Sequence, residues 1–179
     1  MRTRRACRKI ERTETHSVSQ RRDLAVIPTW WERQVSVMGL SASQMVAAAK
    51  AVIEQVSPDA VATELQNGTA TLIDVREERE LVTIGRIPGA LHAPRGMLEF
   101  YADPSSPFHR EEFQPQRRLI LMCGFGGCSA LATETLQRMG YRNVACLEGG
   151  INAWLDQGFP VEHVPTRGIT GPMRHGVSG

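Results

Sequence analysis

One segment of the chain joins a nucleophile to a backbone that is suited to holding an anion. Three glycines lie between Cys123 and Cys128, and Ser129 follows directly. Glycines let the backbone turn tightly and direct its N–H groups inward. A helix is predicted directly after this loop, and its N-terminus would add partial positive charge. We therefore expect Cys123 to exist substantially as a thiolate near neutral pH and to act as a nucleophile.

A second interpretation of the same segment is a structural cysteine buried in a glycine-rich turn, because free cysteines are among the most buried residues. The four cysteines stand at positions 7, 123, 128 and 146, with no C-x-x-C pair and no Cys/His cluster. This spacing argues against a zinc site, and we expect no metal. Four cysteines are also too few for a disulfide-stapled scaffold.

The composition places limits on the class of protein. The chain has 179 residues, of which 41% are hydrophobic and 22% charged, as expected for one globular domain with tails. Lys and Arg number 21 against 19 Asp and Glu, so the net charge of +2 does not suggest a nucleic acid partner. No apolar run reaches the roughly 18–20 residues of a membrane span. We recognise no export signal and expect a cytoplasmic protein.

The elements that must position the loop alternate between helices and strands. Apolar periodicity and capping residues predict helices over 40–56, 58–66, 129–139 and 151–156, with a charged helical turn over 76–81. Short apolar runs predict strands over 71–75, 119–122 and 143–147, and the second is the most apolar run of the chain. This alternation predicts an α/β fold with a central parallel sheet covered by helices on both faces.

The order of these motifs resembles the rhodanese-like family from about residue 57 to residue 162. The resemblance is carried by Leu-Ile-Asp-Val-Arg-Glu at 72–77, Gly-Arg-Ile-Pro-Gly-Ala-Leu-His at 85–92, the cysteine loop at 123–130, and the segments 140–144 and 147–151. It implies a small α/β domain with a central parallel sheet, in agreement with the pattern of elements.

The resemblance also implies a sulfurtransferase that needs no cofactor. Cys123 would attack the outer sulfur of thiosulfate or of another sulfane donor, and a thiol or protein acceptor would take the sulfur from the resulting persulfide. The loop expected to bind substrate and persulfide consists of Gly124, Phe125, Gly126, Gly127, Cys128 and Ser129. The related phosphatases use a longer Cys-x5-Arg loop that encloses phosphate, so the shorter loop favours sulfur chemistry.

The chain departs from the family pattern at two positions. Cys128 stands where the loops often carry a basic residue, and Arg86 replaces the histidine of a Gly-His-Ile-Pro motif. The first change removes a positive charge that would help to bind thiosulfate. Arg76, Arg86 and Arg95 are candidates to supply that charge. Asp74 is expected to brace the loop through hydrogen bonds rather than to act as a base.

Two other functions stay open. The domain would also suit a non-catalytic module for binding or regulation. Alternatively, Cys123 and Cys128 would form a redox switch, or Cys128 would resolve a persulfide. The favoured interpretation of Cys128 is a small buried residue in the first turn of the helix. Cys146, on a predicted strand, is expected to be a bystander.

The predicted domain organisation has four parts. Residues 1–37 carry nine basic and four acidic side chains and are predicted to be a disordered extension, unless the native start is Met38. An N-terminal helix over 38–56 would precede the rhodanese-like domain at 57–164 and a flexible tail at 165–179. Within the domain, the stretch 97–113 would cover an edge of the sheet or wall the mouth of the active site.

Overall fold

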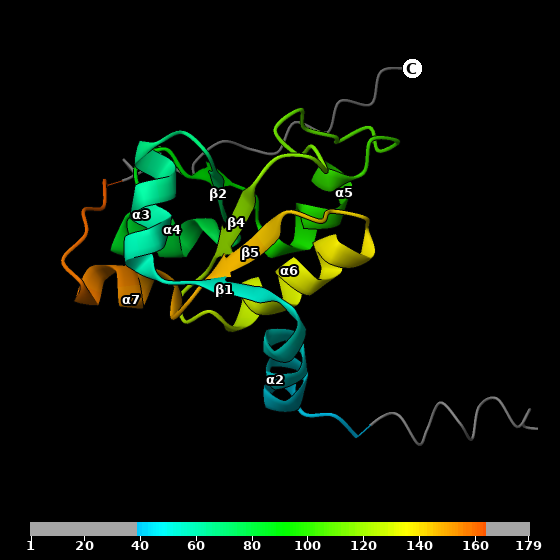
Figure 1. The fold of residues 1–179 in the computed structure, drawn as a ribbon, viewed down its shortest axis with the longest axis horizontal. Helices are drawn as coiled ribbons and strands as arrows, with labels where there is room; N and C mark the ends of the chain where they lie inside the picture. The colour runs from blue at the N-terminus through cyan, green and yellow to red at the C-terminus, as the bar shows by residue number, and fades with distance from the viewer. Residues whose placement is uncertain (1–38, 164–179) are drawn as a thin grey trace, which may run out of the picture. The chain divides into compact units, whose positions relative to one another are not determined.

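The structure is a computed structural model that describes residues 39–163 (Figure 1). The extension predicted over 1–37 and the tail predicted over 165–179 lie outside the described residues. In the part of the chain that is described, no helix is long and apolar enough to cross a membrane.

A five-stranded sheet forms the centre of the domain, and its strands lie in the order β1-β5-β4-β2-β3. All four neighbouring pairs are parallel. The strands are β1 Glu54–Val56, β2 Thr71–Asp74, β3 Leu91–His92, β4 Leu119–Met122 and β5 Val144–Leu147. The prediction of a parallel sheet is confirmed, and β4 is its middle strand, as the continuous apolar run at 119–122 indicates. All four β4 side chains are buried because both faces of the sheet are covered.

Helices cover both faces, as predicted (Figure 1). Buried side chains of α5 and α6 pack on one face of the sheet, and those of α3 and α7 pack on the other. The helices are α2 Ala42–Val52, α3 Pro58–Gln66, α4 Glu78–Ile84, α5 Leu98–Ala102, α6 Gly127–Arg138 and α7 Gly150–Asp156, with a short 3-10 helix, η2, at Arg95–Met97. The bounds predicted for α3 are confirmed. Its start follows from the Ser57 cap and from Pro58 at the first helical position.

The helix predicted over 40–56 is wrong at its end. α2 stops at Val52, and the next residues form β1, which pairs with β5 at the edge of the sheet. Residues 54–56 therefore belong to the sheet and not to an N-terminal helix. The pairing partner lies about ninety residues further along the chain, at 145–147, so the helical periodicity of the local sequence does not reveal it.

α2 buries few of its apolar side chains. Ala49 is fully buried with Ile53 against Ala130 and Cys146, but Met45 is 46% exposed and Val52 66% exposed. The end of α2 therefore packs beside α6 through Ala49 and Ile53.

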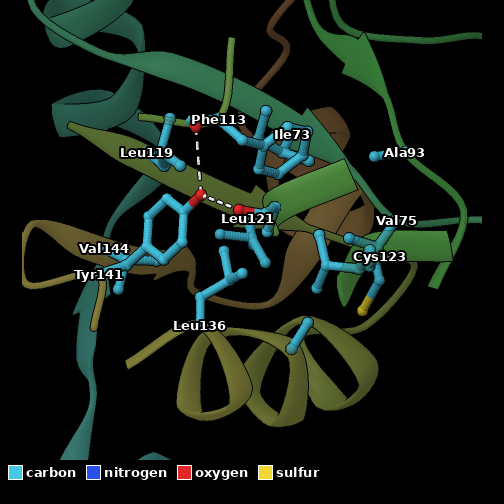
Figure 2. Close-up of a cluster of buried hydrophobic side chains, with 13 residues drawn as sticks. Ile73, Val75, Ala93, Phe113, Leu119, Leu121, Cys123, Leu136, Tyr141 and Val144 are labelled. Atoms are coloured by element: carbon cyan, nitrogen blue, oxygen red, sulfur yellow. Dashed lines mark hydrogen bonds between the residues drawn. The ribbon is translucent and has the colours of Figure 1, made fainter. Parts of the chain in front are cut away.

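Figure 2 shows the buried cluster on the α6 face of the sheet. The Tyr141 hydroxyl lies 2.7 Å from the carbonyl oxygen of Ala102 and 3.2 Å from that of Phe113, and it donates to both. Both acceptors lie in the segment 101–118, whose three prolines and polar residues predict a surface excursion. This prediction is wrong for Phe113, which is 2% exposed. The cluster continues to Cys123 at the end of β4.

Several smaller boundaries also differ from the predictions. The charged helical turn predicted over 76–81 is the helix α4, which begins two residues later and continues to Ile84. α6 begins at Gly127 rather than at residue 129, and α7 begins at Gly150 rather than at residue 151. The start of α6 matters for the site, since it places Cys128 in the first helical turn.

Candidate active site

Cys123 lies directly after β4, at the carboxyl edge of the sheet, and is 5% exposed (Figure 2). The backbone N–H of Ser129 donates to the Cys123 sulfur at an N···Sγ distance of 3.4 Å. The Ser129 hydroxyl oxygen is also 3.4 Å from this sulfur. The sulfur therefore faces the N-terminal turn of a twelve-residue helix, where a negative charge is stabilised.

Gly126 makes the turn between the loop and α6. It is the N-cap of the helix and has a φ of +82°, a conformation that favours glycine. A Cβ at this position would lie 3.3 Å from the backbone nitrogen of Gly149. Both the conformation and the tight contact therefore select glycine here.

The first residues of α7 donate hydrogen bonds to the backbone of the cysteine loop. The N–H of Ile151 donates to the Cys123 carbonyl at 2.8 Å, and the N–H of Asn152 donates to the Gly124 carbonyl at 3.2 Å. A trans peptide places N–H opposite C=O, so the N–H groups of Gly124 and Phe125 point away from α7. The loop is thus oriented by hydrogen bonds to its carbonyl oxygens.

These contacts between α7 and the cysteine loop were not predicted from the sequence. Gly150 packs so closely that a Cβ there would lie 2.4 Å from the Cys123 carbonyl oxygen. The available signal was the pair Gly149-Gly150 before a short helix, but nothing in the local sequence shows that this helix start meets the loop at 123.

A cavity of about 350 Å³ opens beside Cys123. It lies between the cysteine loop and the segment that follows β2. Its lining residues are Val75, Arg76, Glu77, Glu80, Arg95, Cys123, Gly124, Phe125, Gly127 and Cys128. Most members of the predicted binding loop therefore line one cavity together with Cys123.

Arg76 lines the cavity, but its guanidinium is turned to the interior. Its Nη2 lies 2.6 Å from Asp74 Oδ2 and donates to the Gly85 carbonyl at 2.8 Å. The Arg76 backbone N–H also donates to Asp74 Oδ1 at 3.1 Å, and both side chains are about 1% exposed. Nε and Nη2 are held by Asp74, and Nη1 is buried without a hydrogen-bond partner among the described residues, so a substrate contact by Arg76 stays a prediction. Asp74 braces the segment after β2.

Arg86 lies outside the cavity. It forms an ion pair with Glu162 and also exchanges two backbone hydrogen bonds with that residue. Arg86 is absent from the lining of the cavity, so the expectation that it supplies charge there is corrected. Arg95 does line the cavity, but its Nη1 is 2.7 Å from Glu99 Oε1, and Nη2 donates to the Thr135 hydroxyl.

Cys128 is exposed at the cavity, so the prediction of a small buried residue is wrong. Partial burial raises the pKa of its thiol, and the charges of Cys123 and Glu80 raise the pKa further, while Arg95 lowers it. Cys146 is buried on β5 outside the cavity, and burial raises its pKa to about 11.

The remaining predictions concern the stretch 97–113 and a metal site. Arg110 donates to the His92 carbonyl at 2.9 Å, so the stretch 97–113 covers the edge strand β3. None of its residues lines the cavity, and no histidine of the described range does. Residues 39–163 contain no group of three or more His, Cys, Asp or Glu side chains placed to hold a metal ion.

The parallel sheet and the cysteine loop at its carboxyl edge agree with one family. The family model for the rhodanese-like domain matches residues 57–157, and the chain belongs to this family. Among its relatives is thiosulfate sulfurtransferase 18 of Arabidopsis thaliana, 32% identical over 131 residues, which cover 66% of this chain and 92% of that protein. The chain spans only about 23% of the longer adenylyltransferase and sulfurtransferase proteins that it also matches.

Solved structures lead to the same family. A polysulfide-sulfur transferase homodimer of Wolinella succinogenes is 27% identical, with a TM-score of 0.55, over 82% of this chain and 100% of that one. A Rhodopseudomonas palustris protein described as of unknown function and a possible tyrosine phosphatase is 36% identical, with a TM-score of 0.67, over 70% of this chain and 96% of that one. The chain thus has sulfurtransferase relatives in both sequence and structure.

Proposed function

We propose that the protein is a sulfurtransferase that carries sulfane sulfur as a persulfide on Cys123. One observation carries the proposal: the Cys123 sulfur accepts a backbone N–H at the start of α6 and borders a cavity open to a small substrate. The sulfurtransferase relatives support the same reaction class.

The proposed chemistry uses groups that surround the sulfur. The Cys123 thiolate attacks the outer sulfur of thiosulfate, the bond between the two donor sulfurs breaks, and sulfite leaves with the electron pair. The terminal sulfur of the persulfide is anionic. It would be stabilised by the N–H donors of the loop and by the positive end of α6. A thiol or cyanide then removes this sulfur and regenerates Cys123.

The charges around the cavity favour donors that carry less charge than thiosulfate. Glu77 and Glu80 line the cavity, and the two lining arginines are each paired with a carboxylate, Arg76 with Asp74 and Arg95 with Glu99. A dianion would therefore meet little net attraction. We propose that organic persulfides, which carry less charge, react faster than thiosulfate.

Phosphate ester hydrolysis is the contrasting possibility, since the R. palustris protein is described as a possible tyrosine phosphatase. An N–H cradle would also accept phosphate oxygens. However, this loop has no arginine to bind a phosphate dianion, and Cys128-Ser129 stand at its end. We therefore expect sulfur transfer to dominate.

The test measures sulfite release from thiosulfate and sulfur uptake from polysulfide, using the full reduced chain. Intact mass records the bound sulfur, which cyanide should remove. Cys123→Ser should release no sulfite and gain no sulfur, whereas Cys7→Ser, a change outside the described residues, should match the wild type. Absence of both reactions in folded wild-type protein, or their survival in Cys123→Ser, would contradict the proposal. Hydrolysis of p-nitrophenyl phosphate by the same samples tests the phosphatase alternative.

A further inference from the structure

A second thiol borders the same cavity, and simple sulfur transfer gives it no task. Cys128 lies in the first turn of α6, is exposed, and lines the cavity with Cys123. Cys146, in contrast, is completely buried on β5 and does not line it. In the described part of the chain, Cys128 is thus the cysteine that a persulfide on Cys123 can meet.

Covalent geometry limits how far apart the two thiols lie. The Ser129 nitrogen is 3.4 Å from Cys123 Sγ, and the Cα of Cys128 is two bonds from that nitrogen. The Cα of Cys128 therefore lies within about 6 Å of Cys123 Sγ, and a disulfide forms when rotation of both side chains and a small movement of the loop shorten this distance. The loop between the two residues contains three glycines, which makes such an adjustment easy.

We propose that Cys128 resolves the Cys123 persulfide and releases its outer sulfur as hydrogen sulfide. This step rests on the proposed sulfurtransferase function. The deprotonated Cys128 sulfur attacks Cys123 Sγ, and a Cys123–Cys128 disulfide forms. The bond from Cys123 Sγ to the outer sulfur breaks, and the outer sulfur leaves with the electron pair as hydrosulfide, taking up the proton that Cys128 gave up.

The step balances without an added oxidant. The sulfane sulfur gains two electrons and becomes sulfide, while the two cysteine thiols lose two electrons and become a disulfide. A dithiol reductant must then reduce the disulfide for a second turnover. The protein would thus act as a dithiol-dependent sulfide-releasing enzyme in addition to transferring sulfur to acceptors.

The environment of Cys128 suits this second role. Its pKa is raised by partial burial and by the charges of Cys123 and Glu80, so the thiol is largely protonated near neutral pH. Cys123, whose sulfur accepts the Ser129 N–H, is the thiol placed to attack the donor. Cys128 acts once the persulfide is in place.

The experiment loads the full reduced chain with polysulfide or thiosulfate, removes the donor by rapid desalting, and follows sulfide in the absence of reductant. Wild type should release one sulfide per bound sulfur, lose two alkylatable thiols, and yield a Cys123–Cys128 crosslinked peptide. Cys128→Ser and Cys128→Ala should lose sulfide release and retain the persulfide. Cys7→Ser should behave as the wild type.

The outcomes separate this inference from the function on which it rests. A persulfide that is equally stable in wild type and in both Cys128 variants would overturn the resolving step and leave the sulfurtransferase intact. Sulfide release that persists in the Cys128 variants would overturn it too. If neither wild type nor variants take up sulfur from either donor, the sulfurtransferase proposal itself fails.

Discussion

Replacing Gly150 by alanine tests whether α7 positions the cysteine loop. Gly150 has a φ of +65°, and an added Cβ would lie 2.4 Å from the Cys123 carbonyl oxygen and 2.7 Å from that of Gly124. Gly68 offers a matched control, because its φ is also +65° but no atom lies within 4 Å of the position of its Cβ. The two alanine variants share the backbone conformation and differ in the contact.

The matched pair isolates the steric effect. In both variants a left-handed alanine costs roughly 1–2 kcal/mol, partly offset because alanine restricts the unfolded chain by about 0.4–1 kcal/mol. Gly150→Ala must in addition push two backbone carbonyls away, and overpacking of this kind costs about 1–3 kcal/mol. We therefore expect Gly150→Ala to be less stable than Gly68→Ala by about 1–3 kcal/mol.

The same displacement should reach the chemistry. Moving the Cys123 carbonyl to a normal contact distance shifts the loop by nearly an ångström, and misplacements of about 1 Å can reduce rates about a hundredfold. Denaturant unfolding gives the difference in stability. Single-turnover sulfur uptake, measured where both variants are folded, gives the rate. Equal stability and equal uptake for the two variants would refute the role assigned to α7.

Three further predictions follow from other contacts. Cys128→Arg should accelerate sulfite release from thiosulfate about fivefold, because a charge pair about 4 Å apart in water contributes about 1 kcal/mol; Cys128→Ser separates added charge from lost thiol in this assay. Asp74→Ala should lower the free energy of unfolding by about 3–5 kcal/mol, because it leaves the buried Arg76 guanidinium without its carboxylate. Chemical denaturation measures this loss, and a loss below about 1 kcal/mol would contradict the stabilising role of the buried pair. The hydrogen bond from Arg118 lowers the pKa of Glu54 below 4.5, so this pair stabilises the fold above that pH and ceases to do so as pH falls through the lowered pKa. Glu54→Gln should therefore lower stability at neutral pH by no more than about 1 kcal/mol, because Glu54 is exposed, and the difference from wild type should shrink in acid unfolding curves.

Much of the fold was predictable because its signals are local. The helix 58–66 follows from a capping serine, a proline and a glycine stop, and the strand 119–122 follows from an unbroken apolar run. β1 was not predictable from local signals. Its three residues continue a helical periodicity, and only pairing with β5, far along the chain, makes them a strand.

In the candidate site too, some features follow from local sequence and others depend on the tertiary structure. The cysteine loop is contiguous, so one segment of sequence locates Cys123 and the helix start that faces it. The partner of Arg86 was not assignable from local sequence, because it is set by the tertiary structure. Arg86 pairs with Glu162, 76 residues away, whereas Arg76 takes a carboxylate two residues before it. Sequence supplies the three arginines as candidates, and the fold places Arg76 and Arg95, but not Arg86, in the lining of the cavity.

The residue at position 128 affects both which sulfur donor reacts and whether the sulfur bound to Cys123 is released as sulfide. A basic residue there would attract thiosulfate, whereas the cysteine present adds a second thiol beside a cavity with two glutamates. If both proposals hold, Cys128→Arg should change the two half-reactions in opposite directions. It should accelerate persulfide formation from thiosulfate and abolish sulfide release, so that the variant accumulates a stable persulfide. A variant that gained thiosulfate reactivity and still released sulfide would show that the two properties do not share this residue.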